Sequence, residues 1–418
     1  MPRPTPLHLL GAALLAASAS LATATPPPAK APKAADAALC KETGRWLLTG
    51  GKRLQPTLPA GPLSEAASSE VVLLGEQHDQ DDHHRWQLQV LAALHAQRPD
   101  MAIGFEMFPR RLQPVLDRWV DGQLGVREFL TQAEWEQVWN FPPQLYLPLF
   151  EFARINRIPM IALNVDQKLT RAIADKCWQG VPAAEREGVG RPAAPLPAYR
   201  ELLRELHRHH LAGRRQAGKG ENSFDNFLDA QLTWDRAMAE ALAARLAPAT
   251  GQRRRLVVGV MGSGHIRFEH GVPHQLRDLG IKRVTSLLPA SGREECQTLQ
   301  PGIAHAVFVL PDRPAANPEP PRLGVTLEDQ GKGVRIAQLN PGSLAETYGL
   351  KAGDRIVELA GRAPGSSAEV SAAIRRQPPG TWLPFKVARK DGEVEIIVRF
   401  PPQAPAQAKP QPQPQPQP

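Results

Sequence analysis

The sequence predicts a mixed α/β fold, in which a mostly parallel sheet flanked by helices and helical insertions is followed by a small α+β domain. The parallel sheet is predicted because short apolar runs containing β-branched residues alternate with stretches of helical periodicity. A second domain is predicted because residues 312–321 change to Pro, Ala and acidic residues, a composition typical of linkers. The chain of 418 residues is long enough for two domains with cores of their own.

Both ends of the chain are expected to lie outside these domains. Residues 1–24 contain one basic residue, an apolar stretch and the small-x-small sequence Ala22-Thr23-Ala24, which is the pattern of a secretory signal peptide. Residues 25–38 and 403–418 are rich in Pro together with Ala or Gln, so we expect a disordered linker and a disordered tail. The mature protein is therefore expected to be exported to the periplasm or cell envelope.

The first domain is predicted over residues 39–311. Five apolar runs are interpreted as its strands: 71–74, 101–105, 159–163, 256–260 and 283–288. Residues 83–97 place apolar side chains largely on one side, which predicts a helix with Asp79, Asp81 or Asp82 as its N-cap. Strands that alternate with helices in this way predict parallel βαβ units.

Two insertions interrupt this alternation. Residues 133–152 are unusually aromatic and contain Pro142-Pro143, which predicts a helical insertion near the mouth of a ligand-binding crevice. Ordinary core packing explains the same aromatic residues, and the sequence leaves both interpretations open. The second insertion, 177–221, ends in the glycine-containing loop 213–220, which we expect to be mobile.

Charge and cysteine content restrict the partners and the compartment. The formal net charge is +8, but acidic and basic residues are interspersed, so the sequence specifies no nucleic-acid site. Cys40, Cys177 and Cys296 allow one disulfide in an oxidising compartment, and the sequence leaves open which pair forms or whether all three stay reduced. Cys40 lies well beyond the predicted signal peptide, so no lipoprotein anchor is expected.

Polar side chains follow several of the predicted strands. Glu76 and His78 follow the first strand, Glu106 follows the second, and His265 follows the fourth. Because side chains beyond the carboxyl ends of parallel strands line one edge of the sheet, we expect these four to meet there.

Both histidines end a Gly-x-x-His sequence, in which Gly75 or Gly262 directly follows apolar strand residues. We expect both glycines to adopt positive φ, which would let the chain turn tightly out of each strand.

Two chemistries suit this set of side chains. In the first, a divalent metal ion is bound by His78, His265 and a carboxylate, Glu106 or Glu76, and generates hydroxide from a bound water. In the second, a histidine acts as general base on water while a glutamate orients it. The candidate catalytic residues are therefore Glu76, His78, Glu106 and His265, and the candidate metal ligands are His78, His265 and Glu106.

Four motifs in the first domain resemble the ChaN family, in family order: residues 74–79, 104–110, 158–164 and 262–265. The resemblance covers about residues 40–310 and implies a haem-binding, iron-linked protein of the bacterial envelope with haem at a dimer interface. Haem or another small ligand and a homodimer are therefore expected. The wider group includes Tiki metal-dependent proteases and erythromycin esterases, so the resemblance implies a hydrolase as the alternative, with the four candidate catalytic residues at functional positions.

The resemblance also leads us to expect a tyrosine as the haem ligand. The mature chain offers Tyr146, Tyr199 and Tyr348, and the sequence identifies none of them as the ligand. Tyr146 lies in a family-like stretch, where a structural role is expected for it.

Residues 322–402 resemble a PDZ domain. Arg322-Leu323-Gly324-Val325 matches the carboxylate-binding loop of that family, and residues 340–345 and 349–356 match its core pattern. The resemblance implies that the N–H groups of Leu323, Gly324 and Val325 bind a C-terminal carboxylate while the peptide adds a strand beside helix 368–376. Protein C-termini are therefore the expected partners, and a PDZ domain that only packs against its neighbour is the alternative.

Overall fold

The computed structural model describes residues 39–40, 43–139, 141–216, 223–246, 254–311, 322–331, 333–378 and 380–401. The predicted signal peptide, both predicted linkers, the C-terminal tail and half of the predicted loop at 213–220 lie outside these residues. The chain divides into two compact units, Met1–Arg313 and Pro314–Pro418. Within the described ranges, no helix is long and apolar enough to cross a membrane.

The first unit is built on an eight-stranded sheet with the strand order β2-β1-β8-β7-β3-β6-β4-β5. The strands from β8 to β5 in this order are parallel, whereas β1 is antiparallel to both of its neighbours. The strands are β1 (Arg45–Leu48), β2 (Gln55–Thr57), β3 (Val71–Glu76), β4 (Met101–Pro109), β5 (Met160–Asn164), β6 (Leu256–Gly262), β7 (Val284–Ala290) and β8 (Ala306–Val309). This confirms the mostly parallel sheet that the sequence predicts.

All five predicted strands are present, and each continues beyond its predicted end. Glu76 is the last residue of β3, and Glu106 lies inside β4 rather than after it. The pairing of β4 with β5 shifts register between Phe105 and Pro109, an irregularity that occurs where Glu106 leaves the regular ladder. The sequence pattern misses β1, β2 and β8, which have only three or four residues each.

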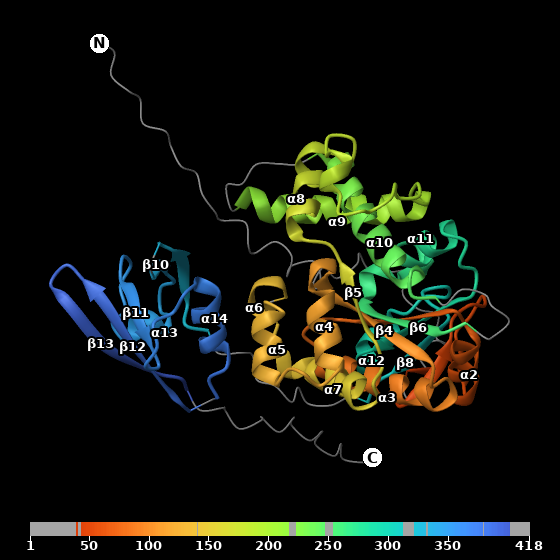
Figure 1. Cartoon of the computed structure of the whole chain (residues 1–418), viewed down its shortest axis with the longest axis horizontal. Coiled ribbons are helices and arrows are strands. Elements are labelled where there is room, and N and C mark those ends of the chain that lie inside the picture. Colours follow the sequence, from red (N-terminus) through yellow and green to blue (C-terminus); the bar gives the residue numbers. More distant parts are fainter. Residues whose placement is uncertain are drawn as a thin grey trace, which may run out of the picture. The chain divides into compact units, whose positions relative to one another are not determined.

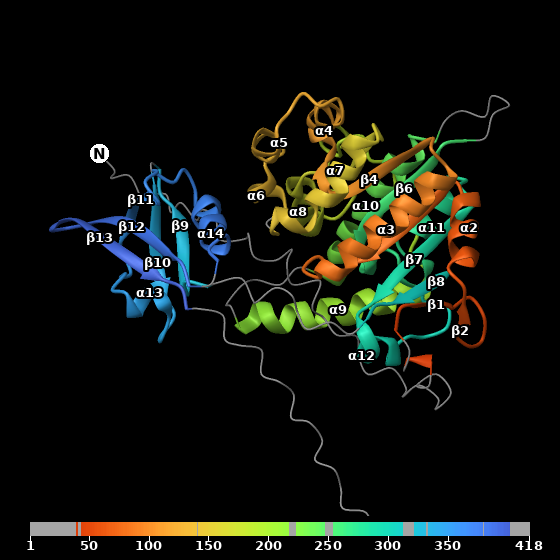
Figure 2. The same ribbon diagram turned by 90° about the horizontal axis from the view of Figure 1, so that it is seen from below.

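Helices cover both faces of this sheet (Figures 1 and 2). Side chains alternate between the faces, so that Val72 and Leu74 join one core and Val71 and Leu73 join the other. The first core is completed by α2 (Ala60–Ser68), α3 (Asp81–Gln97), α4 (Gln113–Val120), α5 (Val126–Gln132), α6 (Trp135–Val138) and α7 (Leu147–Ile155). The second is completed by α10 (Phe224–Ala243), α11 (Val272–Asp278) and α12 (Gly292–Gln297). Two further helices, α8 (Gln167–Lys176) and α9 (Pro197–Gln216), pack on α10.

The start of α3 differs from the prediction. Its N-cap is Gln80, which makes no side-chain capping hydrogen bond, so the expected capping by Asp79, Asp81 or Asp82 is wrong. Asp81 and Asp82 lie in the first turn instead. There their negative charges interact favourably with the positive end of the helix dipole.

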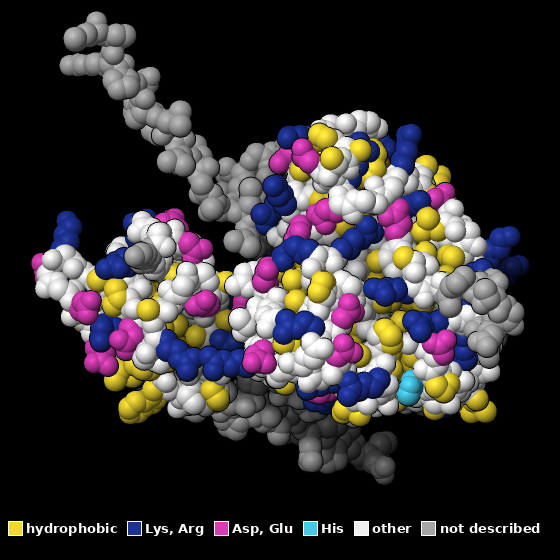
Figure 3. Space-filling model, viewed as in Figure 1, with side chains coloured by type: hydrophobic (Ala, Val, Ile, Leu, Met, Phe, Trp, Pro, Cys, Tyr) yellow, Lys and Arg dark blue, Asp and Glu magenta, His cyan; other side chains and the backbone are white. Residues whose placement is uncertain are grey.

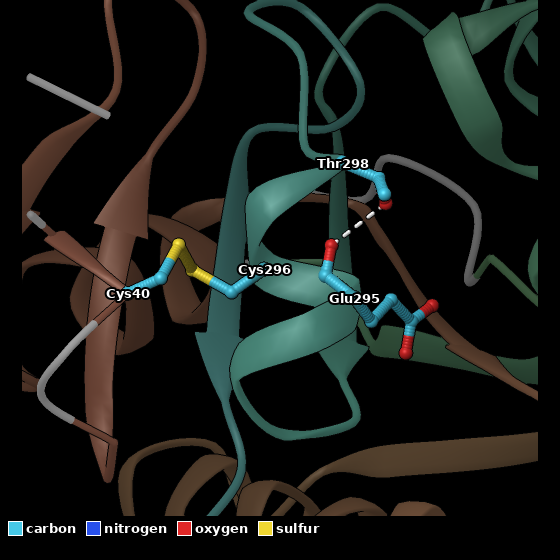
Figure 4. The surroundings of a disulfide bond; sticks show 4 residues. All are labelled: Cys40, Glu295, Cys296 and Thr298. Carbon is cyan, nitrogen blue, oxygen red and sulfur yellow. Dashed lines mark hydrogen bonds between the residues drawn. A yellow bond between two sulfur atoms is a disulfide. The ribbon is translucent and has the colours of Figure 1, made fainter. Parts of the chain in front are cut away.

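A disulfide joins the segment before β1 to α12 (Figure 4). The bond links Cys40 to Cys296, and the Cα atoms of the two residues are 5.6 Å apart. Cys177 is the free cysteine among the described residues. The structure therefore selects one of the pairings that the sequence left open.

The second unit is a five-stranded antiparallel sheet with the order β13-β12-β11-β10-β9 and two helices. Its elements are β9 (Val325–Asp329), β10 (Val334–Leu339), α13 (Leu344–Thr347), β11 (Arg355–Leu359), α14 (Ser367–Arg375), β12 (Trp382–Arg389) and β13 (Gly392–Arg399). The strand β9 is an edge strand, and α14 packs against it.

On the face drawn in Figure 3, Lys and Arg side chains are mixed with Asp and Glu.

Candidate functional site

The structure brings the four candidate catalytic residues together at the carboxyl ends of β3, β4 and β6. These strands are neighbours in the sheet, and Glu76 of β3 is in register with Gly262 of β6. His265 ends a short 3-10 turn, Ser263–His265, that directly follows β6. Glu106 interacts electrostatically with both His78 and His265, so the two Gly-x-x-His sequences place their imidazoles around one carboxylate.

Glu76 orients the first histidine. Nδ1 of His78 lies 2.7 Å from Oε1 of Glu76, and that carboxylate is buried. The ring of His78 also makes an edge contact with Trp139 at 4.7 Å and a tilted contact with Phe141 at 5.4 Å. The side chain keeps 14% of its surface exposed, so its other ring nitrogen, Nε2, is the coordination position that remains for a ligand.

A second carboxylate orients the second histidine. Nδ1 of His265 lies 2.6 Å from Oδ1 of Asp235 in α10, and its Nε2 lies 3.5 Å from Oε1 of Glu106. The other oxygen of Glu106 accepts a hydrogen bond of 2.6 Å from the backbone N–H of Gly262. The edge of Trp234 contacts the His265 ring at 4.9 Å. The second histidine is therefore held between two carboxylates.

Glu76 and Asp235 each accept a hydrogen bond from a buried tyrosine. The hydroxyl of Tyr146 donates to Oε1 of Glu76 at 2.9 Å, and the hydroxyl of Tyr199 donates to Oδ2 of Asp235 at 2.8 Å. The site thus contains two Tyr–carboxylate–His chains that converge on Glu106. The sequence offers Tyr199 only as one of three possible haem ligands and does not assign Asp235 to the site, because both lie on helices far from either Gly-x-x-His sequence.

The expected positive φ of Gly75 and Gly262 is wrong. Gly262 has φ −56° and ψ 136°, and Gly75 also lies outside the left-handed region. Both glycines are required by close packing instead. A Cβ on Gly262 would lie 3.0 Å from Cε1 of His78, and one on Gly75 would lie 2.3 Å from Leu288.

The charges within the site stabilise one another. Burial disfavours the charged form of His265, but Glu106 and Asp235 outweigh burial and raise its pKa to about 10. Burial likewise opposes a charge on His78, whose pKa is nevertheless raised by Glu76 and Glu106. The nearby histidines overcome the opposing effect of burial and lower the pKa of Glu76. The structure therefore favours carboxylates paired with imidazolium ions.

Two more histidines, His83 and His84, contact Glu76 or the loop that carries His78. Nδ1 of His84 lies 3.1 Å from Oε2 of Glu76, so this carboxylate is contacted by two imidazoles. His83 accepts a hydrogen bond from the backbone N–H of Gln77, and burial lowers its pKa to about 3. Both rings are almost fully buried and support the loop that carries His78.

The arrangement does not fit a bound metal ion as it stands. Among the described residues, no group of three or more His, Cys, Asp or Glu side chains has the geometry to hold one. Nε2 of His265 lies 3.5 Å from Oε1 of Glu106, and Nδ1 lies 2.6 Å from Oδ1 of Asp235, so a carboxylate is close to each ring nitrogen. His78, His265 and Glu106 therefore converge, and metal binding by this set stays a prediction.

Tyrosine ligation of haem also disagrees with the structure. Tyr146 and Tyr199 are buried, and burial together with a neighbouring carboxylate raises the pKa of each phenol well above its ordinary value. Neither hydroxyl is therefore free to bind iron as a phenolate. The third tyrosine, Tyr348, packs against the core of the second unit.

Two shallow hollows lie on the first unit away from these residues. One is lined by Leu48, Gly50, Gly51, Arg53, Gln55, Glu65 and His305, and the other by Arg110, Gln113, Ile161, Ala162, Glu240, Ala241, Ala244 and Arg245. Neither hollow includes His78 or His265.

Hydrogen bonds and close packing anchor the loop before β9, which contains Leu323, Gly324 and Val325. Its carbonyls are used inside the unit, since Leu323 accepts from Ala345 N at 3.0 Å and Gly324 accepts from Asn340 N at 2.8 Å. Gly324 has φ +76°, and a Cβ there would lie 2.4 Å from Cβ of Ser343, so only glycine suits this position. The loop is held rigidly at the start of the free edge of β9.

Comparison with known proteins adds family information. The family described as haem-binding uptake, Tiki superfamily, ChaN matches residues 63–276, and the PDZ domain family matches residues 321–399. No curated protein matches the chain.

Solved structures resemble parts of the chain. A structure of cofacial haem binding to ChaN of Campylobacter jejuni is 16% identical, covers 63% of this chain and 96% of that one, and has a TM-score of 0.47. The serine endoprotease from Yersinia pestis is 20% identical, with coverage of 20% and 29% and a TM-score of 0.18. An HtrA3 PDZ domain bound to a phage-derived ligand (FGRWV) is 20% identical, with coverage of 19% and 88% and a TM-score of 0.16. Because the match at residues 63–276 spans just over half of the 418 residues, the chain belongs to the ChaN family of the haem-binding uptake, Tiki superfamily, and it carries a PDZ domain.

Proposed function

We propose that this chain is an exported protein of the bacterial envelope that binds haem at His78. The observation that carries the proposal is the environment of that ring, with Nδ1 on a buried carboxylate and 14% of the side chain exposed. Histidines that bind metals typically donate their second ring N–H to a carboxylate in this way, which fixes the ring and increases its basicity. Trp139 and Phe141 provide aromatic surface beside the ring, against which a porphyrin can pack.

The residues of the site fit haem better than they fit a bare metal ion. A haem iron already has four porphyrin ligands and needs one or two from the protein, so a single available imidazole is sufficient. The site therefore needs no group of three protein ligands.

Titration with hemin tests this proposal. The unaltered chain is expected to give a saturable change in the Soret band, and His78→Ala is expected to weaken binding by at least about tenfold, a loss of about 1.4 kcal/mol. Added imidazole should restore the spectrum of the His78→Ala complex by replacing the missing ring. His274→Ala, which removes a partly exposed histidine on α11, is the matched control and should bind like the unaltered chain. Equal affinity of the His78→Ala and unaltered chains would refute ligation by His78.

A hydrolase is the second candidate function, and the Asp235–His265–Glu106 arrangement favours it. A histidine held protonated between two carboxylates can donate a proton to a leaving group. His78, whose pKa is raised by Glu76 and Glu106, can act as the base once its ring has lost a proton. On this alternative the haem-free chain hydrolyses ester or amide substrates, and His78→Ala and His265→Gln both lower the rate. Absence of any turnover by haem-free protein across such substrates would exclude it.

The PDZ domain is proposed to bind the C-termini of proteins. The N–H groups of Leu323, Gly324 and Val325 would bind the terminal carboxylate, and the peptide would add a strand between the free edge of β9 and α14. Fluorescence anisotropy with a peptide that ends in an apolar residue should show binding that is lost when the C-terminus is amidated. Equal binding of the free acid and the amide would contradict carboxylate recognition.

A further inference from the structure

The strand β13 exposes apolar side chains at one edge of the sheet of the second unit. It pairs with β12 on one side and with no other described strand. Trp382 on β12 is 57% exposed and Ile397 on β13 is 48% exposed, and neither joins the core of the unit. Pro384 lies opposite Ile397 in the register of the two strands. Trp382, Pro384 and Ile397 therefore form an apolar patch, called the β13 patch below, beside an unpaired strand edge.

The backbone groups of β13 alternate between β12 and the free edge. The N–H of Phe400 donates to the carbonyl oxygen of Thr381 at 2.9 Å, which fixes the alternation along this antiparallel ladder. Every second residue from 394 to 400 therefore bonds to β12. The residues between them direct their N–H and C=O groups outward: Glu393, Glu395, Ile397 and Arg399.

Features that commonly block an exposed strand edge are missing from β13. Proteins usually protect such edges with short strands, prolines, lysines or β-bulges. The strand β13 has eight residues, contains no Pro or Lys, and pairs with β12 without a shift of register. Its outer edge can therefore accept the hydrogen bonds of another strand.

The order of side chains along β13 is complementary to itself. The outward-bonding positions begin with Glu393 and Glu395 and end with Ile397 and Arg399. In an antiparallel pair of β13 strands centred on Ile397, the two Ile397 side chains lie opposite each other. Glu395 of each copy then lies opposite the partner's Arg399, and opposed charges stabilise such cross-strand pairs. A second copy of the same strand therefore suits this edge in both charge and apolar character.

We propose that this chain self-associates through β13, which pairs with β13 of a second copy in an antiparallel arrangement with two-fold symmetry. The two five-stranded sheets then become one continuous sheet, and the β13 patches of both copies lie side by side on one face. The strand β9 is at the opposite edge, so its proposed peptide-binding edge stays open in both copies. Such a dimer can bind two C-termini of one assembly at once, which increases the apparent affinity. The inference depends neither on haem nor on the residues around His78.

Sedimentation equilibrium of the haem-free, full-length chain tests this proposal. The average mass of the unaltered chain should rise with concentration toward that of two chains. Glu395→Arg and Arg399→Glu each place like charges opposite each other in the pair, so each should weaken self-association at least about tenfold. Glu393→Arg is the matched control, because residue 393 lies beyond the oppositely charged pairs, and this variant should associate like the unaltered chain.

A mixture of the two charge variants provides the sharper test. A pair made of one Glu395→Arg chain and one Arg399→Glu chain has opposite charges at both contacts, so the mixture should associate about as strongly as the unaltered chain. This recovery would also show that both variants are folded. An unaltered chain that stays monomeric across the concentration series would refute self-association. Variants that associate alone as strongly as the unaltered chain, or a mixture without recovery, would refute pairing through β13.

Discussion

At the scale of single residues, the two Gly-x-x-His histidines are bound to carboxylates in different ways. His78 has one carboxylate on Nδ1, and 14% of its side chain is exposed. His265 has a carboxylate near each ring nitrogen. The first ring is therefore suited to bind a ligand, whereas the second is suited to remain a buried cation that compensates the charges of Glu106 and Asp235.

The buried cation at His265 predicts how stability depends on pH. Its pKa is about 10 in the folded chain against an ordinary value of 6.5, so its stabilising effect is complete below pH 6.5 and is lost as the pH rises toward 10. The free energy of unfolding of the first unit should fall by up to about 1.4 kcal/mol per pH unit over this window. Urea denaturation at a series of pH values between 6.5 and 10 measures this change in the free energy of unfolding. His265→Gln should flatten the slope, and an equal slope in both proteins would show that His265 is not charged in the folded state.

At the scale of elements, the site depends on how closely β6 approaches the loop after β3. Gly262→Ala tests this packing, because its backbone angles suit alanine while the added Cβ would lie 3.0 Å from Cε1 and 3.2 Å from Nε2 of His78. The ring must move, which should cost on the order of 1 kcal/mol and weaken hemin binding about fivefold.

Gly264→Ala in the same turn is the control for that substitution. Gly264 is exposed, and a Cβ there would meet nothing within 4 Å. Hemin affinity should therefore be unchanged, as measured by the same Soret titration. Equal affinities for Gly262→Ala and Gly264→Ala would contradict the close contact between β6 and His78.

The sequence predicts those parts of the site that depend on local pattern. Apolar runs identify the five long strands, and adjacent parallel strands bring Glu76, Glu106 and His265 to one edge. Asp235 and Tyr199 escape such reasoning, because they come from α10 and α9 and reach His265 only through packing of those helices.

At the scale of the whole molecule, the chain forms two compact units with separate cores, and a disulfide links two described residues of the first unit. The disulfide closes a loop between residues separated by 256 positions, and both cysteines are buried. No sequence pattern identifies this pair, because the pairing depends on α12 approaching the segment before β1. The second unit has its own core, formed around Phe385, Phe400 and Val334 among others.

Thiol labelling and denaturation test the disulfide. Without reductant, mass spectrometry should find the alkylating label on Cys177 alone, because Cys40 and Cys296 are bonded. The double substitution Cys40→Ser and Cys296→Ser should lower the free energy of unfolding of the first unit by about 2–4 kcal/mol, as measured in urea. Labelling of all three cysteines in protein purified from the periplasm would contradict the bond.

A crystal structure of the haem-bound chain, with the iron located by anomalous scattering, tests the central claim most directly. Our account predicts that the iron is coordinated by Nε2 of His78 while Nδ1 stays hydrogen-bonded to Glu76. Iron held by another residue, or a His78 ring turned away from the haem, would contradict it.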